Sequence, residues 1–365
     1  MARQSGSINP VPKSEVEAVL TVTPVKVTDP RQTRQVFVVD AVGSGIFQRC
    51  LSMVLYYRKE EDGSGWLVAG WIKESLGKAL LEQPMLGGRL RRGENGEGGL
   101  EIVSNDSGIR LVEAQIAMNL SDFLELKERE EAEAELVFWK EIEEQNPEFS
   151  PLFYVQVTIF RCGGYSVGIS CSILLTDLLL GTNFLKTWAN IHQNVVAQNG
   201  SSKVPIFYLP NLKKPSNTPV SVITSASSKS RGLTLFFKIT SESVNFDTEF
   251  WKKLALQCLE EVENRLGKEV AVHFSLFLNE SFETIKVESC SKHEMVKSEN
   301  WNIKMQLAPA AWEDLGETVF SLTEGNKPVL VSKWIGASSD GVFQAIPSPD
   351  AKEINIIVTV PNEKL

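Results

Sequence analysis

Histidine and cysteine are scarce in this sequence, and their scarcity excludes several kinds of site. The chain has three histidines and five cysteines in 365 residues. The cysteines are scattered and form no C-x-x-C pair, so they predict neither a disulfide framework nor a zinc site; they are Cys50, Cys162, Cys171, Cys258 and Cys290. We therefore expect no metal and a reducing compartment.

Clustered positive charge and long apolar runs are also missing. The net charge is -9, and the basic cluster that stands out is Arg89, Arg91 and Arg92. Because the phosphate backbone of nucleic acids rewards clustered Lys and Arg, we expect no nucleic-acid partner. No run approaches the roughly 20 apolar residues that span a bilayer, and the first residues lack the apolar core of a signal peptide. We therefore expect no transmembrane segment.

What is present is the composition of a globular protein of more than one domain. The content is 42% hydrophobic and 23% charged, which allows an ample core. A segment rich in Ser, Pro, Lys and Thr without sustained periodicity, 201–231, predicts a crossover between residues 1–200 and 232–365. Both halves mix strand-like and helix-like periods, so the expected class is α/β (α+β), with a mixed sheet and helices in each half.

The expected elements follow from period and from turn residues. Strands are expected at 35–41, 51–58, two within 99–116 about an Asn-Asp-Ser-Gly turn, 152–162, 165–174, 233–240, 270–278, near Val319, 329–334 and 354–360. Helices are expected at 65–83, 181–198 and 247–266. An acid-rich helical stretch is expected at 120–145, its glutamates in water and its apolar side chains, Phe123, Leu124, Leu136 and Trp139, facing the protein.

The residues between Cys162 and His192 are the main candidates for chemistry. A strand, a turn and a helix converge on Asp177, and a run of small and apolar residues precedes it. The run Gly168-Ile-Ser170-Cys-Ser172 approaches a G-x-S-x-G nucleophile elbow but lacks the last glycine that the sharp turn needs. The histidines, His192, His273 and His293, have no carboxylate or second ligand at a spacing that would make them bases or metal ligands. Each is expected to lie on the surface or to be partly buried with its hydrogen bonds satisfied.

Several segments together resemble the plant BAHD acyltransferases, the HXXXD-type family. They are residues 74–92, 107–114, 149–170, Asp177 and 184–189. The resemblance implies two chloramphenicol-acetyltransferase-like domains that enclose a channel, with acyl-CoA entering from one face and an alcohol or amine acceptor from the other. In that family the motif histidine removes the proton of the acceptor.

The resemblance places that histidine at Ile173, whereas the motif aspartate is retained as Asp177. Isoleucine accepts no proton, and the loss of a general base costs about 10²- to 10⁴-fold in rate. Asp177 is then expected to cap the following helix or to pair with an arginine, which would orient the loop without contact to substrate. The resemblance also assigns the frame of the channel to Gly163, Gly164, Ser170 and Ser172.

The second signature of the family, D-F-G-W-G-K-P, is equally degenerate. Its remnant at 322–328 keeps Lys327 and Pro328, and the second domain is shorter than usual around 290–300. In these departures the sequence resembles the eceriferum and glossy wax proteins, a subgroup of the family. That subgroup implies a cytoplasmic protein, peripheral at the endoplasmic reticulum, that acts with a fatty-acid elongase condensing enzyme in very-long-chain lipid extension.

Three functional hypotheses follow from the resemblance. The first is a non-catalytic BAHD-fold protein that assists elongation, monomeric on its own, with no bound cofactor and with acyl-CoA as a candidate ligand. The second is an acyl-CoA-dependent O- or N-acyltransferase with an atypical base, either His192 or a water-mediated arrangement around Asp177. The third is a truncated paralogue or splice form with little function of its own.

Overall fold

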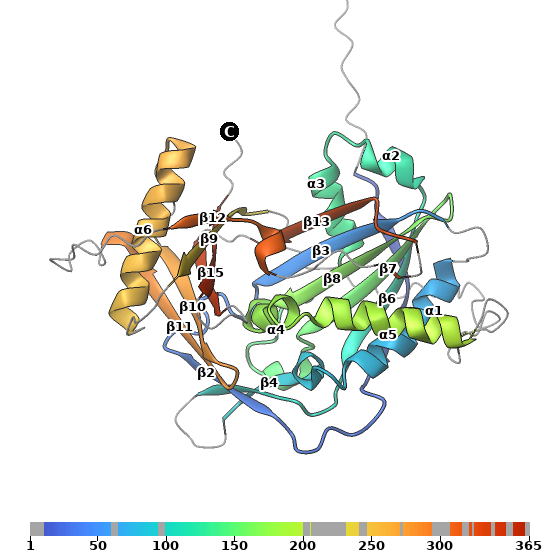
Figure 1. Cartoon of the computed structure of the whole chain (residues 1–365), viewed down its shortest axis with the longest axis horizontal. Coiled ribbons are helices and arrows are strands. Elements are labelled where there is room, and N and C mark those ends of the chain that lie inside the picture. Colours follow the sequence, from blue (N-terminus) through green and yellow to red (C-terminus); the bar gives the residue numbers. More distant parts are fainter. Residues whose placement is uncertain are drawn as a thin grey trace, which may run out of the picture.

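Two β-sheets organise the part of the chain that the computed structural model describes. That part comprises residues 11–59, 65–93, 99–199, 205, 231–240, 247–270, 273–293, 307–315, 321–322, 325–336, 340–347 and 353–361. Figure 1 shows the two sheets next to each other, with helices packed against them. The mixed α/β class expected from the sequence is confirmed. The predicted crossover 201–231 lies outside the described residues, except for Pro205 and Arg231.

The first sheet is six-stranded, in the order β1-β6-β7-β8-β3-β13. Strands β6 and β7 run parallel, and the other neighbours are antiparallel. Its strands are β1 (Ser14–Val22), β3 (Cys50–Tyr57), β6 (Ile109–Ile116), β7 (Phe153–Phe160), β8 (Tyr165–Ser172) and β13 (Leu330–Ile335). Every residue of β3 and β8 is buried, as expected for central strands covered on both faces.

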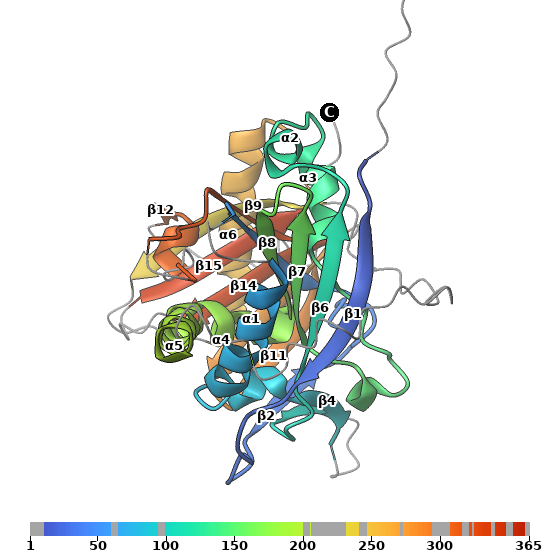
Figure 2. The ribbon, with the colours of Figure 1, turned by 90° about the vertical axis from the view of Figure 1, so that its right-hand side faces the viewer.

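Helices cover one face of this sheet and short turns cover the other. On one face α1 (Gly65–Ala79) packs beside α5 (Phe184–Asn199), as Figure 2 shows, and their apolar residues join the largest hydrophobic cluster. The opposite face is covered by α2 (Leu120–Leu124), α3 (Arg129–Ala132) and the 3₁₀ turn η2 (Glu133–Leu136), which build a separate apolar cluster. The sheet is therefore the middle layer of three.

The second sheet is nine-stranded, in the order β12-β9-β15-β14-β10-β11-β2-β5-β4. Its strands are β2 (Thr33–Val38), β4 (Arg89–Arg92), β5 (Leu100–Val103), β9 (Leu233–Thr240), β10 (His273–Ser281), β11 (Thr284–Ser291), β12 (Ala308–Ala310), β14 (Gly341–Pro347) and β15 (Glu353–Val360). Three short 3₁₀ turns lie in the connections: η1 (Pro84–Gly87) between α1 and β4, η3 (Pro147–Phe149) before β7, and η5 (Trp312–Leu315) between β12 and β13.

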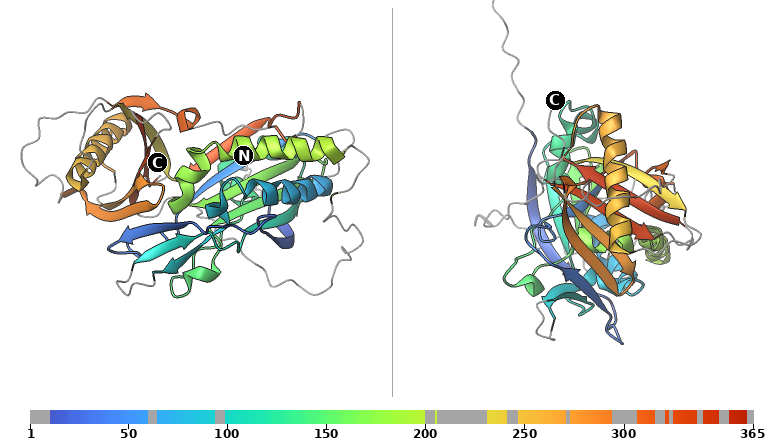
Figure 3. Two further views of the ribbon diagram at one scale, coloured as in Figure 1. Left: turned by 60° about the horizontal axis from the view of Figure 1, so that its bottom comes forward. Right: turned by 90° about the vertical axis from the view of Figure 1, so that its left-hand side faces the viewer.

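One long helix, α6 (Thr248–Leu266), packs on the outer face of this second sheet, as both views of Figure 3 show. The Asp247 side chain caps its start by accepting a hydrogen bond from the Phe250 N–H at 2.8 Å. Gly267 ends the helix in the left-handed conformation, with φ of 67°, which glycine adopts without a Cβ penalty. These signals explain why the helix expected at 247–266 is confirmed almost to the residue.

The sheets exchange strands across the crossover. Strand β13 follows the crossover in sequence but pairs with β3 in the first sheet. Strand β2 precedes the crossover but pairs with β11 in the second sheet, and β5 and β4 extend that sheet from β2. The division into residues 1–200 and 232–365 stays a prediction, and hydrogen-bonded ladders cross it in both directions.

Most of the expected elements are confirmed, and the missed ones are strands and the short helix α4 (Thr176–Leu180). Those expected at 35–41, 51–58, 152–162, 165–174, 233–240, 270–278, 329–334 and 354–360 correspond to β2, β3, β7, β8, β9, β10, β13 and β15, and the expected helices to α1, α5 and α6. The strand expected near Val319 lies outside the described residues. The strands that the sequence pattern did not indicate are β1, β4, β11, β12 and β14.

The two strands expected within 99–116 exist, but the hairpin between them is wrong. Strand β5 belongs to the second sheet and β6 to the first. Asp106, with φ of 56°, accepts hydrogen bonds from the N–H and hydroxyl of Thr28 at 2.9 and 2.6 Å. A Cβ on Gly108 would lie 2.2 Å from the Val22 carbonyl oxygen. The turn is therefore held against the 22–28 segment, and the chain passes from one sheet to the other there.

The acid-rich stretch 120–145 is not a continuous helix, and one of its glutamates is not in water. It forms α2, α3, η2 and an extended segment, because Phe123, Leu136 and Trp139 all turn into the protein. Glu133 is fully buried. The expectation of an entirely solvated acidic face was therefore wrong at this position.

Glu133 is the centre of a polar network that joins four segments. Its carboxylate accepts hydrogen bonds from the Tyr56 hydroxyl at 2.9 Å and the Ser332 hydroxyl at 2.7 Å. It also pairs with Arg231 and, at 3.5 Å, with Arg129. The Arg231 guanidinium lies over the Trp334 ring, 3.9 Å from its centroid. A single buried carboxylate thus links β3, β13, α3 and the residue at which the crossover ends.

Candidate functional site

The candidate site lies where β8 ends and turns back across the first sheet. The chain passes from Ser172 into the 3₁₀ turn η4 (Ile173–Leu175) and then into α4 (Thr176–Leu180). The Ser172 hydroxyl caps this turn by accepting a hydrogen bond from the Leu174 N–H. The Ile173 N–H donates to the carbonyl of Arg49 at 3.1 Å. Main-chain and capping hydrogen bonds therefore hold the turn in place.

Ile173 occupies an apolar environment and is 1% exposed. It belongs to the largest hydrophobic cluster, together with Leu174, Leu175 and Leu178. Its carbonyl oxygen accepts a hydrogen bond from the side-chain amide of Gln344 on β14, at 3.1 Å. The second sheet is thus hydrogen-bonded directly to the residue at which the resemblance expects a catalytic histidine.

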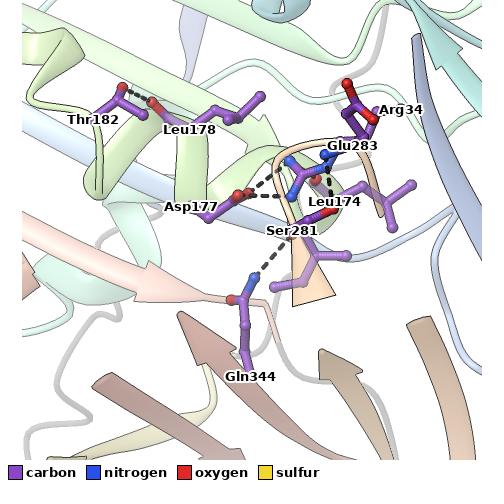
Figure 4. A network of polar contacts seen from close by, with 9 residues as sticks. Arg34, Leu174, Asp177, Leu178, Thr182, Ser281, Glu283 and Gln344 are labelled. Carbon is purple, nitrogen blue, oxygen red and sulfur yellow. Dashed lines mark hydrogen bonds and ion pairs between the residues drawn. The ribbon is translucent and has the colours of Figure 1, made fainter. Parts of the chain in front are cut away.

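Asp177 forms a two-pronged ion pair with Arg34 of β2, drawn in Figure 4. The two N···O distances are 3.0 and 2.7 Å, and Arg34 also approaches the Leu174 carbonyl at 3.5 Å. The Arg34 side chain is fully buried and that of Asp177 is 13% exposed. Of the two roles expected for Asp177, the structure shows the arginine pair. Because β2 belongs to the second sheet, this pair also joins the two sheets.

Several buried polar atoms at this turn and on strands of the second sheet have no hydrogen-bond partner. Among the described residues they are Arg34 Nε, Thr176 Oγ1, Gln344 Oε1, Asn355 Oδ1 and Asn279 Nδ2. A buried polar atom normally has a partner, and each exception needs an explanation such as a water or a ligand. Arg34 and Gln344, which both contact this turn, thus each keep one buried polar atom without a partner, a donor on Arg34 and an acceptor on Gln344.

His192, the alternative base, lies in a different network on α5. It is 1% exposed, and its Nδ1 lies 3.0 Å from the Ser75 hydroxyl of α1, which also accepts from the Trp188 indole at 3.0 Å. Burial lowers the pKa of His192 from 6.5 to about 4. The ring is therefore neutral near pH 7 and bridges α1 and α5. His273 and His293 are exposed.

The predicted channel frame consists of two glycines in the turn between β7 and β8 and two serines on β8. Gly163, with φ of 85°, makes the turn between β7 and β8, and its N–H donates to the Phe160 carbonyl. Gly164 follows it, and its carbonyl accepts from the Phe160 N–H. Ser170 is buried and its hydroxyl has no partner among the described residues, whereas Ser172 caps η4. The lining of a channel by these residues stays a prediction.

The remnant of the second signature leads directly into β13. Lys327 is exposed, and its N–H closes a turn onto the Gly325 carbonyl at 3.1 Å. Pro328 is half-buried, and the next residue, Val329, donates its N–H to the Tyr56 carbonyl at 2.8 Å. The remnant is therefore followed directly by a strand of the first sheet. Of the shortening expected around 290–300, residues 294–300 lie outside the described part.

Arg34 and Gln344 were not indicated by the sequence, although both contact the candidate site. Arg34 precedes the strand expected at 35–41, and no role was assigned to it; in β2 it lies on the same buried face as Val36. Gln344 lies in GVFQAIP, a strand that the pattern did not indicate. A buried arginine opposite a retained aspartate would have been found only by knowing that β2 joins the second sheet.

A family model matches residues 18–268 of the chain, and its description is the Transferase family. This chain belongs to the Transferase family. The match spans more than half of the chain and includes both Ile173 and Asp177. It agrees with the resemblance to BAHD acyltransferases.

Curated relatives match shorter segments of this member of the Transferase family. A hydroxycinnamoyltransferase of Narcissus pseudonarcissus is 32% identical over 138 residues, 38% of this chain and 31% of the relative. Protein ECERIFERUM 26-like of Arabidopsis thaliana is 32% identical over 120 residues, 32% of this chain and 27% of the relative. Protein ECERIFERUM 2 of the same plant is 38% identical over 87 residues, 24% and 20% of the two chains. The matched segments thus span less than a third of each of these relatives.

Solved structures align over most of the chain at low identity. Vinorine synthase aligns over 96% of this chain and 95% of its own, with 13% identity and a TM-score of 0.43. TRI101 of F. graminearum, solved with ethyl coenzyme A, aligns over 91% and 96%, with 12% identity and a TM-score of 0.41.

Neither a membrane-spanning helix nor a metal-type cluster occurs among the described residues. None of the helices there is long and apolar enough to cross a membrane. In the same part of the chain, no group of three or more His, Cys, Asp and Glu side chains is arranged to hold a metal ion.

Proposed function

We propose that this chain is a non-catalytic member of the Transferase family that assists very-long-chain fatty-acid elongation and wax synthesis by contacting a condensing enzyme. The observation that carries the proposal is the environment of Ile173. An aliphatic side chain occupies the position of the family's base, packs in an apolar cluster and leaves only its carbonyl to accept a hydrogen bond. The similarity to two ECERIFERUM proteins supports the choice of pathway.

The packing around Ile173 explains why a histidine introduced at this position would not readily restore catalysis. A histidine there would replace an apolar side chain that is 1% exposed. Burial of an imidazole without a hydrogen-bond partner disfavours its protonated form, and a general base needs that form to be accessible. The site is therefore adapted to an apolar residue.

The contacts retained around Ile173 and Asp177 allow a binding role that requires no proton transfer. The Arg34–Asp177 pair and the Gln344–Ile173 hydrogen bond each join the first sheet to the second. The unpartnered polar atoms beside them complement a ligand that carries both donors and acceptors, such as the amide-containing arm of acyl-CoA. In the proposed role the protein holds acyl-CoA without turnover, from the cytoplasmic side of the endoplasmic reticulum.

The test is co-expression with a plant condensing enzyme in a host that makes no wax. We expect longer acyl products and co-purification of the two proteins. The Ile173→His variant serves as the internal comparison, and it should give no gain in product length over the wild type if acyl transfer plays no part. Unchanged product lengths together with no co-purification would contradict the proposal.

The second candidate is acyl-CoA-dependent transfer to an alcohol or amine with an atypical base. The observation that favours it is the intact Asp177–Arg34 pair next to unpartnered polar atoms, where a water could be held. Turnover of an acyl-CoA with a panel of acceptors, abolished by Asp177→Ala or His192→Ala, would establish this function. The non-catalytic role and the acyltransferase both require CoA to bind. Calorimetric titration with CoA therefore distinguishes these two functions from a protein-binding scaffold that holds no ligand, for which no binding is expected.

A further inference from the structure

The basic cluster noted in the sequence is only partly explained by internal contacts. Arg91 on β4 pairs with Glu101 at 2.7 Å. Arg92 is exposed and donates to the Glu144 carbonyl at 3.4 Å. Arg89 is 3% exposed and reaches main-chain carbonyls, those of Gly87, Gly88, Ser107 and Gly108, at 2.8 to 3.4 Å. Carbonyl oxygens satisfy the donors of Arg89 but do not neutralise its charge.

A second arginine, Arg110, lies near Arg89 and has no hydrogen-bond or ion-pair partner among the described residues. Arg110 follows the segment that Arg89 holds, and the structure, in the part it describes, gives it neither a hydrogen bond nor an ion pair. Its residue as a whole is partly exposed, yet its NH1 atom is buried without a partner. A buried cationic N–H without an acceptor destabilises the folded protein unless a ligand or water accepts its hydrogen bond.

Tyr154 completes the cluster on the neighbouring strand. It is paired directly with Arg110 between β6 and β7, and in a parallel ladder such neighbours lie on the same face. Tyr154 is 3% exposed and its ring contacts Phe138 and Trp139, with centroids 5.5 and 5.6 Å away. On the other side Arg110 pairs with the exposed Thr21 of the edge strand β1. The cluster therefore has an aromatic wall on one side and water on the other.

The charges of these groups act on one another. Burial, and next the positive charge of Arg110, lower the pKa of Arg89 from 12.5 to about 10. Burial raises the pKa of Tyr154 to about 12, against the opposing effect of Arg110 and Arg89. The two guanidinium groups thus repel each other in a place where no carboxylate of the described residues is paired with either of them.

We infer that Arg110, with Arg89 and Tyr154, forms a binding site for a small oxyanion. An arginine presents paired N–H donors that match a phosphate or carboxylate. The Tyr154 hydroxyl adds a donor from the next strand, and the anion removes the repulsion between the guanidinium groups. The site is separate from the one around Ile173, because Arg110 alternates with Leu111, whose side chain belongs to the large cluster on the opposite face of the sheet.

The experiment is calorimetric titration of the full chain with inorganic phosphate, and separately with acetate, at constant ionic strength. The variants are Arg110→Gln and Tyr154→Phe. Arg92→Gln is the matched control, since it removes the same charge from an exposed position on β4, a strand of the second sheet. Urea midpoints and circular dichroism establish that each variant is folded.

Wild type and Arg92→Gln should bind the anion with the same affinity, and Arg110→Gln should bind it at least about tenfold more weakly. Tyr154→Phe should show a smaller loss. Tighter binding of phosphate assigns a phosphoryl ligand, whereas tighter binding of acetate assigns a carboxylate; either supports the site. Undiminished binding by Arg110→Gln, or no binding of either anion by the wild type, would overturn the inference.

Discussion

Replacement of Glu133 by glutamine should destabilise the protein through the network that joins the two halves of the chain. Removal of one partner of a buried ion pair costs about 3–5 kcal/mol. Arg231 and Arg129 are 18% and 36% exposed, so water can partly solvate them once the carboxylate is gone. Glutamine also keeps an oxygen for the Tyr56 and Ser332 hydroxyls. We therefore expect a loss of about 2–3 kcal/mol, below the full range for a buried pair.

The assay is urea unfolding followed by circular dichroism, with Glu130→Gln as the control. Glu130 lies on α3 next to this network and is exposed, so the same charge change should alter stability by less than about 0.5 kcal/mol. Equal midpoints for Glu133→Gln and Glu130→Gln would refute the reasoning. The double variant with Arg231→Gln should then lose less than the two single losses combined, because both remove the same interaction.

Three further changes test other parts of the structure. Asp177→Asn leaves the buried Arg34 without its carboxylate and should lower stability by about 2–4 kcal/mol; a denaturation midpoint equal to that of the wild type would contradict this. Gly168→Ala would place a Cβ 1.9 Å from the Leu136 carbonyl oxygen and should lose about 2 kcal/mol, whereas Gly99→Ala, with open space around it, should be nearly neutral in the same denaturation. Burial lowers the pKa of His192 from 6.5 to about 4, so the unfolded chain binds a proton that the folded chain does not, and stability falls as pH drops through this window by up to about 3 kcal/mol; stability measured against pH should be flatter there for His192→Asn.

The sequence predicted the elements that have strong local signals. Helix α6 has both an aspartate cap and a glycine stop, and β7 and β8 are apolar runs around a glycine turn. Strand β1, SEVEAVLTV, was missed although its residues alternate between half-buried and exposed positions. Pairing between distant segments, such as β2 with β11, has no local signal at all.

The position of the candidate site could be predicted from the sequence, but the residues that contact it could not. Counting along the motif located Ile173 and Asp177, and the arginine expected as a partner of Asp177 is present as Arg34. That this arginine comes from β2, and that Gln344 bonds to Ile173, depends on how the sheets meet. Glu133 was misjudged for the same reason, since its burial follows from tertiary contacts and not from its acidic neighbours.

The strand exchange between the sheets also bears on what a cut chain would do. After a break in the crossover, the N-terminal piece would keep β2, which pairs with β11 of the other piece, and the C-terminal piece would keep β13, which pairs with β3. Each piece alone would therefore expose unpaired backbone N–H and C=O groups at the edges of its strands. Unpaired strand edges recruit complementary strands. The two pieces should therefore reassemble as a non-covalent complex when mixed, and either piece alone should be prone to aggregation.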